Sequence, residues 1–155
     1  MSFDKCFASV VGVEGGYVND LKDPGGETKF GISKRSYPAE DIKNLTIERA
    51  KELYRRDYWD KIRGDMIASP LDAFVFDAAV NQGVEPAIKM LQKIVGVAQD
   101  GICGMVTQRK AQSATKEHAA LFMAERAMRY YGTRNFDIYG RGWLKRLFVV
   151  AMDAL

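Results

Sequence analysis

Val13-Glu14-Gly15-Gly16-Tyr17, with its continuation to Ile32, is the stretch around which the rest of the chain is organised. Apolar residues before it recur at helical spacing, which predicts an amphipathic helix that begins after Ser2 and stops at the glycine pair. Glu14 follows Phe7 by one heptad, so both residues fall on nearly the same helix face. The residues of this apolar stripe are Phe3, Cys6, Phe7, Val10 and Val11.

Glu14 is the candidate acid of this stretch. Partial burial and the negative end of the helix dipole would both raise the pKa of a carboxyl group at this position. A carboxylic acid that keeps its proton near neutral pH can act as a general acid. The alternative from position alone is a surface carboxylate on a frayed last helical turn.

The segment after Tyr17 is polar and rich in turn residues. Asp23-Pro24-Gly25-Gly26 is a strong turn signal, and residues 17–18 and 30–32 suit short extended arms on either side. Such a turn can fold back over the helix end and bring Asp23 and Thr28 close to Glu14. An acid, a second carboxylate and a hydroxyl around one cleft are the groups that glycoside hydrolysis requires.

These motifs resemble the signature of glycoside hydrolase family 108, a family of phage and prophage muramidases that includes proteins formerly labelled secretion activators. The resemblance runs from Phe3 to the region of Trp143. The Glu, Asp and Thr order is also similar to the catalytic triad of phage-type lysozymes, in which the Thr lies one residue further on. The motifs that carry the resemblance are Glu14-Gly15-Gly16-Tyr17, Asp23-Pro24-Gly25-Gly26, Thr28 and Phe30-Gly31-Ile32-Ser33.

The resemblance implies an N-acetylmuramidase that cleaves the β-1,4 bond between N-acetylmuramic acid and N-acetylglucosamine. Glu14 would protonate the leaving oxygen, Asp23 would stabilise developing positive charge or orient a water, and Thr28 would hold that water. A hydroxyl beside the second carboxylate favours single displacement with inversion. The implied substrate contacts are Tyr17, Tyr58, Trp59 and Asn81. From the residues alone, the pair Tyr58-Trp59 at a helix end is more often a core element than a sugar-stacking surface, and Asn81 is equally a polar helix cap.

The implied architecture is mainly α, a lysozyme-like helical domain with a small hairpin or irregular lobe at about residues 17–32. Apolar periodicity and cap residues agree with a mostly helical chain. Residues 1–155 are interpreted as a single domain. Within it, residues 84–155 are a candidate peptidoglycan-binding-like helical lobe, because Asp100-Gly101 resembles the turn of small peptidoglycan-binding repeats. Helices are expected over residues 46–58, 70–82, 86–95, 106–114, 115–131 and 139–154.

Composition narrows the chemistry. Cys6 and Cys103 sit in apolar surroundings with no metal-ligand spacing, which predicts two reduced buried thiols and no metal site. His118 is the single histidine, so we expect neither a catalytic triad that uses histidine nor a metal site with several histidines. Residues 105–155 carry nine Lys or Arg against four Asp or Glu, which suits a polyanionic partner such as the bacterial wall. No nucleic-acid motif accompanies this charge, and no cofactor is expected.

The expected setting is the cytoplasm of a host bacterium, with release to the wall through a holin pore. No signal peptide or signal-anchor is recognisable, and no stable membrane insertion is expected. The expected partner is peptidoglycan, and the expected state is a monomer. Two other functions remain open: a lytic transglycosylase with Glu14 as its only acid and base, and a non-catalytic wall-binding or secretion-accessory protein.

Overall fold

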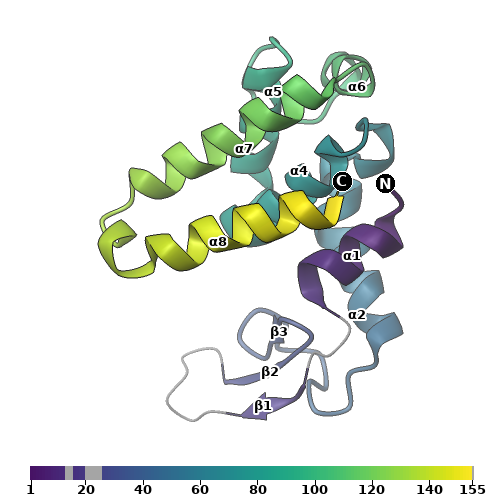
Figure 1. Ribbon diagram of the computed structural model, residues 1–155. Helices are drawn as coiled ribbons and strands as arrows, with labels where there is room; N and C mark the ends of the chain where they lie inside the picture. The colour runs from purple at the N-terminus through teal and green to yellow at the C-terminus, as the bar shows by residue number, and fades with distance from the viewer. Residues whose placement is uncertain (13–15, 20–25, 155) are drawn as a thin grey trace.

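The computed structural model describes residues 1–12, 16–19 and 26–154. The chain is mainly α-helical with one small sheet, as predicted (Figure 1). The helices are α1 (Phe3–Val11), α2 (Ile47–Tyr54), α3 (Asp60–Ile62), α4 (Leu71–Gln82), α5 (Val84–Ile94), α6 (Met105–Gln112), α7 (Lys116–Tyr131) and α8 (Phe136–Ala154). The strands are β1 (Val18–Asn19), β2 (Glu27–Lys29) and β3 (Ile32–Ser33). None of the helices in these ranges is long and apolar enough to cross a membrane.

Helix α4 is the centre of the fold. Every residue from Leu71 to Ala79 is buried, including two aspartates, so this helix has no solvent face over that length. A helix that is apolar nearly all round must be covered on all sides, and α1, α5, α7 and α8 pack against it. Helices α7 and α8 form a long pair beside it (Figure 1). One continuous hydrophobic core therefore extends from Phe3 to Val150.

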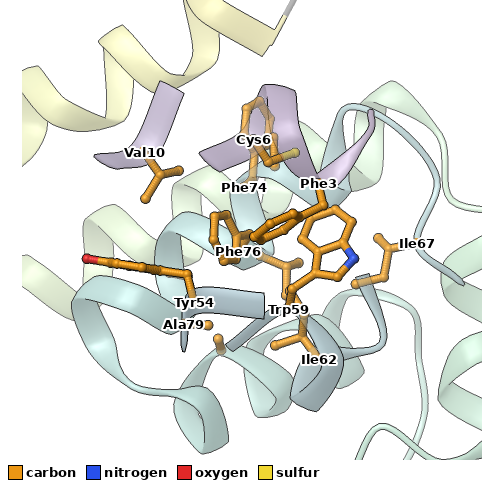
Figure 2. Close-up of a cluster of buried hydrophobic side chains, with 14 of the residues drawn as sticks. Phe3, Cys6, Val10, Tyr54, Trp59, Ile62, Ile67, Phe74, Phe76 and Ala79 are labelled. Carbon is orange, nitrogen blue, oxygen red and sulfur yellow. The ribbon is translucent and has the colours of Figure 1, made fainter. Parts of the chain in front are cut away.

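An aromatic cluster joins α1 to α4 (Figure 2). The ring of Trp59 meets Phe3 and Phe76 edge-on, with ring centroids 5.6 and 5.5 Å away, a geometry that aromatic quadrupoles favour. Gly64 permits this packing because a Cβ at that position would lie 2.4 Å from the indole ring. The cluster fixes α1, and with it the start of the segment that leads to Glu14.

The three strands form an antiparallel sheet in the order β1-β2-β3, in the lobe expected at residues 17–32. Phe30 and Gly31 connect β2 to β3 with φ angles of 50° and 73°, the combination of a type I′ turn. The Tyr54 hydroxyl donates to the Phe30 carbonyl at 3.2 Å. A Cβ at Gly31 would lie 2.5 Å from this same hydroxyl oxygen. The turn is therefore held against α2 at close range.

Two helix boundaries differ from the predictions in the N-terminal half. Helix α1 ends at Val11 and not at the glycine pair, because Gly12 adopts φ 77° and leaves the helix. The prediction that Glu14 lies on the helical stripe concerns a residue outside the described part of the chain. Helix α2 has the predicted Thr46 cap, whose hydroxyl accepts from the Arg49 amide at 3.2 Å. It continues past Tyr58 through a π-helical turn, Arg55–Trp59, into α3.

Boundaries around α4 and α5 also shift by one or two residues. Pro70 is the cap residue that precedes α4 and does not start it, so the predicted cap, Ser69, lies one residue too early. Gly83 ends α4 as predicted, but α5 begins at Val84. Pro86 is tolerated in the first turn because amides there need no intrahelical partner. Helix α8 begins at Phe136, three residues before the predicted start.

Candidate active site

Glu14 and Asp23, the two predicted catalytic carboxylates, lie outside the described residues. The structure defines the elements on either side of them. Helix α1 delivers the chain to Gly12, and the sheet begins again at Val18 and Glu27. Figure 1 shows the sheet on the side of α8 away from α7. The described residues therefore show the elements that lead into and out of the two segments that carry these carboxylates.

The last turn of α1 is bound by an arginine from the far end of the chain. Arg146 of α8 donates through Nη2 to the Val10 carbonyl at 3.1 Å. The last carbonyls of a helix have no intrahelical partner, so a cation at this position satisfies one and opposes the helix dipole. Arg146 thereby fixes the helix end four residues before Glu14 in the sequence.

Arg146 is itself held by a buried carboxylate, Asp77 of α4. The Asp77 Oδ1 atom accepts from Arg146 Nη2 at 2.6 Å and Nε at 2.9 Å. Its Oδ2 accepts from Arg126 Nη2 at 2.6 Å, and neither Asp77 nor Arg126 is exposed. Gln82 accepts from Arg126 Nε at 3.1 Å. Because charges this deep are costly unless paired, the cluster requires all its partners.

Thr28 occupies the middle of the central strand. It pairs with Val18 on one side and Ser33 on the other, and it is partly exposed. Its hydroxyl is 3.5 Å from the Gly26 carbonyl, at the outer limit of a hydrogen bond. A hydroxyl so weakly engaged can accept from or donate to a water. The predicted water-binding role of Thr28 remains a prediction.

Tyr17 lies on the same lobe, next to β1, and is 38% exposed. Its hydroxyl donates to Glu27 Oε1 at 2.6 Å, and this bond raises the pKa of the tyrosine. The structure therefore places Tyr17 and Thr28 in one lobe, with Tyr17 accessible to a ligand.

Tyr58 lines a surface pocket of about 550 Å³ between the π-helical turn Arg55–Trp59 and the segment around Pro38. Tyr37 in this pocket donates to Asp57 Oδ2 at 3.0 Å. Burial raises the pKa of Tyr37, whereas the hydrogen bond from Arg56 lowers the pKa of Asp57. The Asp57 carboxylate therefore already accepts hydrogen bonds from Tyr37 and Arg56. Tyr58 is the partly exposed aromatic residue that lines the pocket beside it.

Trp59 does not fit the predicted role as a sugar contact. Its side chain has no exposed surface, and its Nε1 donates to Asp65 Oδ1 at 3.1 Å (Figure 2). The helix continues through Trp59 as a π turn and directs this ring into the core, beside Phe3 and Phe76. Trp59 is therefore a core residue, which is the alternative that the sequence left open for the pair Tyr58-Trp59. Of the two, only Tyr58 is accessible to solvent.

Asn81 lies at the exposed end of α4 and borders a pocket of about 260 Å³. Its Nδ2 donates to the Asp77 carbonyl at 2.8 Å and to Asp77 Oδ1 at 3.2 Å. It thus joins the same buried cluster that binds the end of α1. The structure does not bring Asn81 and Tyr58 into one pocket.

Sequence reasoning missed the residues that link these parts: Asp77, Arg126, Arg146 and Tyr54. The hydroxyl of Tyr54 bonds the sheet, while burial raises its pKa to about 12. Asp77 inside the apolar run of α4 could have indicated this cluster from the sequence, since a buried carboxylate requires a cationic partner. Within the described ranges, no group of three or more His, Cys, Asp or Glu is suited to a metal ion.

The helical core with its small three-stranded lobe, taken with similarity to known proteins, defines a glycoside hydrolase. A family model described as Glycosyl hydrolase 108 matches residues 7–83. The solved structure of Brucella abortus SagA is 34% identical, with a TM-score of 0.82, and the alignment covers 97% of this chain and 92% of that chain. No curated protein matches. The chain belongs to glycosyl hydrolase family 108, which confirms the resemblance and, at family level, supports a peptidoglycan hydrolase.

Proposed function

We propose that this protein is an N-acetylmuramidase that cleaves the β-1,4 bond between N-acetylmuramic acid and N-acetylglucosamine, and that it serves as a phage or prophage endolysin. The observation that carries this proposal is the family match over residues 7–83, which spans both Glu14 and Asp23. Support comes from the order of elements, in which a helix bound at its end by Arg146 precedes Glu14 and a small sheet follows it.

Glu14 is the general acid that protonates the glycosidic oxygen as the bond breaks. Asp23 stabilises the oxocarbenium-like charge or orients the attacking water, and the Thr28 hydroxyl helps to hold that water. Tyr17, Tyr58 and Asn81 contact the substrate. Trp59 is left out of this set because its ring is enclosed in the core.

Peptidoglycan is the partner, and a monomer is the working unit. The protein acts from the host cytoplasm after a holin pore opens the way to the wall, without stable insertion in the membrane. Hydrolysis of a glycoside by two carboxylates needs no organic cofactor or metal.

The released ends of the glycan test the activity. Purified peptidoglycan digested by the protein should yield muropeptides with a hydrated, reducible muramic acid end, identified by mass spectrometry. A 1,6-anhydro end would instead identify a lytic transglycosylase, and intact walls would identify a non-catalytic wall-binding or secretion-accessory protein. Either result would reject the muramidase assignment.

The same digest shows whether the reaction at the anomeric carbon is a single displacement, which inverts the configuration, or a double displacement, which retains it. A water held between Asp23 and Thr28 would attack the face opposite the leaving group, so the α-anomer should form first in an NMR time course. A β-anomer formed first would mean retention and would exclude the single displacement.

A further inference from the structure

A pocket of about 260 Å³ opens where the end of α4 meets α7 and α8. Of the predicted site residues that the structure describes, only Asn81 lines it. Its walls combine two arginines, two amides, a hydroxyl and two aromatic rings. The lining residues are Asn81, Gln82, Arg129, Tyr130, Thr133, Trp143 and Arg146.

Positive charge exceeds negative charge at this pocket. Beneath it, Arg126 and Arg146 share the single carboxylate of Asp77, so the three side chains carry a net charge of +1. Arg126 and Asp77 are fully enclosed, whereas Arg146 is 35% exposed and lines the pocket. Arg129 is exposed at the rim and adds a second charge. Because none of the described lining residues is acidic, the pocket suits an anion.

The remaining walls suit an amide-bearing ligand. The Nδ2 group of Asn81 donates to Asp77, which leaves its side-chain oxygen as the acceptor available to a ligand. Trp143 is half-buried and stacks on Tyr130 with ring centroids 5.0 Å apart, which gives the pocket a rigid apolar side. Carboxylate, amide and aliphatic groups can therefore be bound together here.

The pocket adjoins the candidate active site through one side chain. Arg146 lines the pocket and also binds the Val10 carbonyl in the last turn of α1. From this turn the chain runs on to Glu14. Arg146 therefore links the pocket to the helix end that precedes Glu14 in the sequence.

We propose that this pocket binds the carboxylate-bearing peptide stem attached to N-acetylmuramic acid. This inference rests on the proposed function and names the part of the substrate that the site selects. The glycan backbone is neutral, whereas the stem carries both amides and carboxylates, the groups for which the pocket has partners. A volume of about 260 Å³ is below the 300–1,000 Å³ typical of pockets that enclose whole ligands, so it fits a substituent.

Arg129 provides the sharpest test because it is exposed and forms no ion pair within the described residues. Arg129→Gln should raise KM about fivefold on walls that carry stems, with kcat unchanged, as expected for one partly solvated charge pair. On glycan stripped of stems by an amidase, with the lactyl carboxylates that this exposes converted to methylamides, it should behave as wild type. The matched control is Arg134→Gln, an exposed arginine five residues further on, in the α7–α8 connection, that does not line the pocket. Equal losses on both substrates, or no loss on either, would overturn the proposal.

A binding measurement separates this inference from the proposed activity. N-acetylmuramoyl-tripeptide has a stem but no glycosidic bond to cleave, and Trp143 reports on the pocket because the other tryptophan, Trp59, is enclosed. Wild type should show a saturable change in tryptophan fluorescence, and Arg129→Gln should bind about fivefold more weakly. If both fluorescence results are obtained but neither wall substrate is cleaved, the proposed muramidase activity is rejected while binding of the stem in the pocket is supported. No saturable change in wild type would reject the pocket.

Discussion

Asp77 links helix α4 to helices α7 and α8. It accepts hydrogen bonds from Arg126 of α7, from Arg146 of α8 and from Asn81 of its own helix. Through Arg146 the connection reaches the Val10 carbonyl of α1. One carboxylate thus sets the position of the helix end that precedes Glu14 and the charge of the adjoining pocket.

Replacing Asp77 by Asn should lower the free energy of unfolding by about 3 kcal/mol, because removing one partner leaves buried cations uncompensated. Chemical denaturation at neutral pH measures this loss. The control is Glu85→Gln, which removes an exposed pair with Lys89 and should change stability by less than about 0.5 kcal/mol. Equal losses in the two variants would contradict the role given to Asp77.

The sequence could not reveal this cluster, and it singled out Asn81 only as a substrate contact or a helix cap. Asp77 lies 49 residues from Arg126 and 69 from Arg146, and no local pattern pairs residues at such separations. The thiols were predictable because they are local: Cys6 and Cys103 are free and buried, as expected. Burial raises the pKa of Cys6 to about 12 and that of Cys103 to about 11.

At the scale of elements, periodicity predicted the helices well and their ends less well. The stripe of Phe3, Cys6, Phe7 and Val10 is buried as expected, because helical spacing alone fixes which face is apolar. The end of α1 at Gly12 was missed because several nearby glycines compete as stop signals. The lobe was placed correctly at residues 17–32, but its anchor on Tyr54 depends on a contact with a distant helix.

The β2–β3 turn allows a test of this anchor. Gly31→Ala should lower the free energy of unfolding by about 1–3 kcal/mol, because the residue has φ 73° and its Cβ would lie 2.5 Å from the Tyr54 hydroxyl. Gly142→Ala is the matched control with the opposite sign. Gly142 lies inside α8 with open space around it, so alanine should raise stability by about 0.5–1 kcal/mol. Denaturation curves in which both variants shift the same way would contradict this account.

At the scale of the whole molecule, one helical core holds a small sheet against α2. The core fixes its elements through Trp59 and its aromatic neighbours, so a residue expected at the substrate surface is instead part of the scaffold. The predicted fold class and family are confirmed, whereas the catalytic roles of Glu14, Asp23 and Thr28 stay predictions.

The rate at which purified peptidoglycan is cleared by Glu14→Gln, beside wild type, tests the central claim most directly. Glutamine keeps the shape of the side chain but cannot deliver the proton, so the rate should fall by about 10²–10⁴. Denaturation curves should show the fold intact, and Glu48→Gln, an exposed residue in the first turn of α2, should clear walls like wild type. Clearing by Glu14→Gln at the wild-type rate would contradict the account.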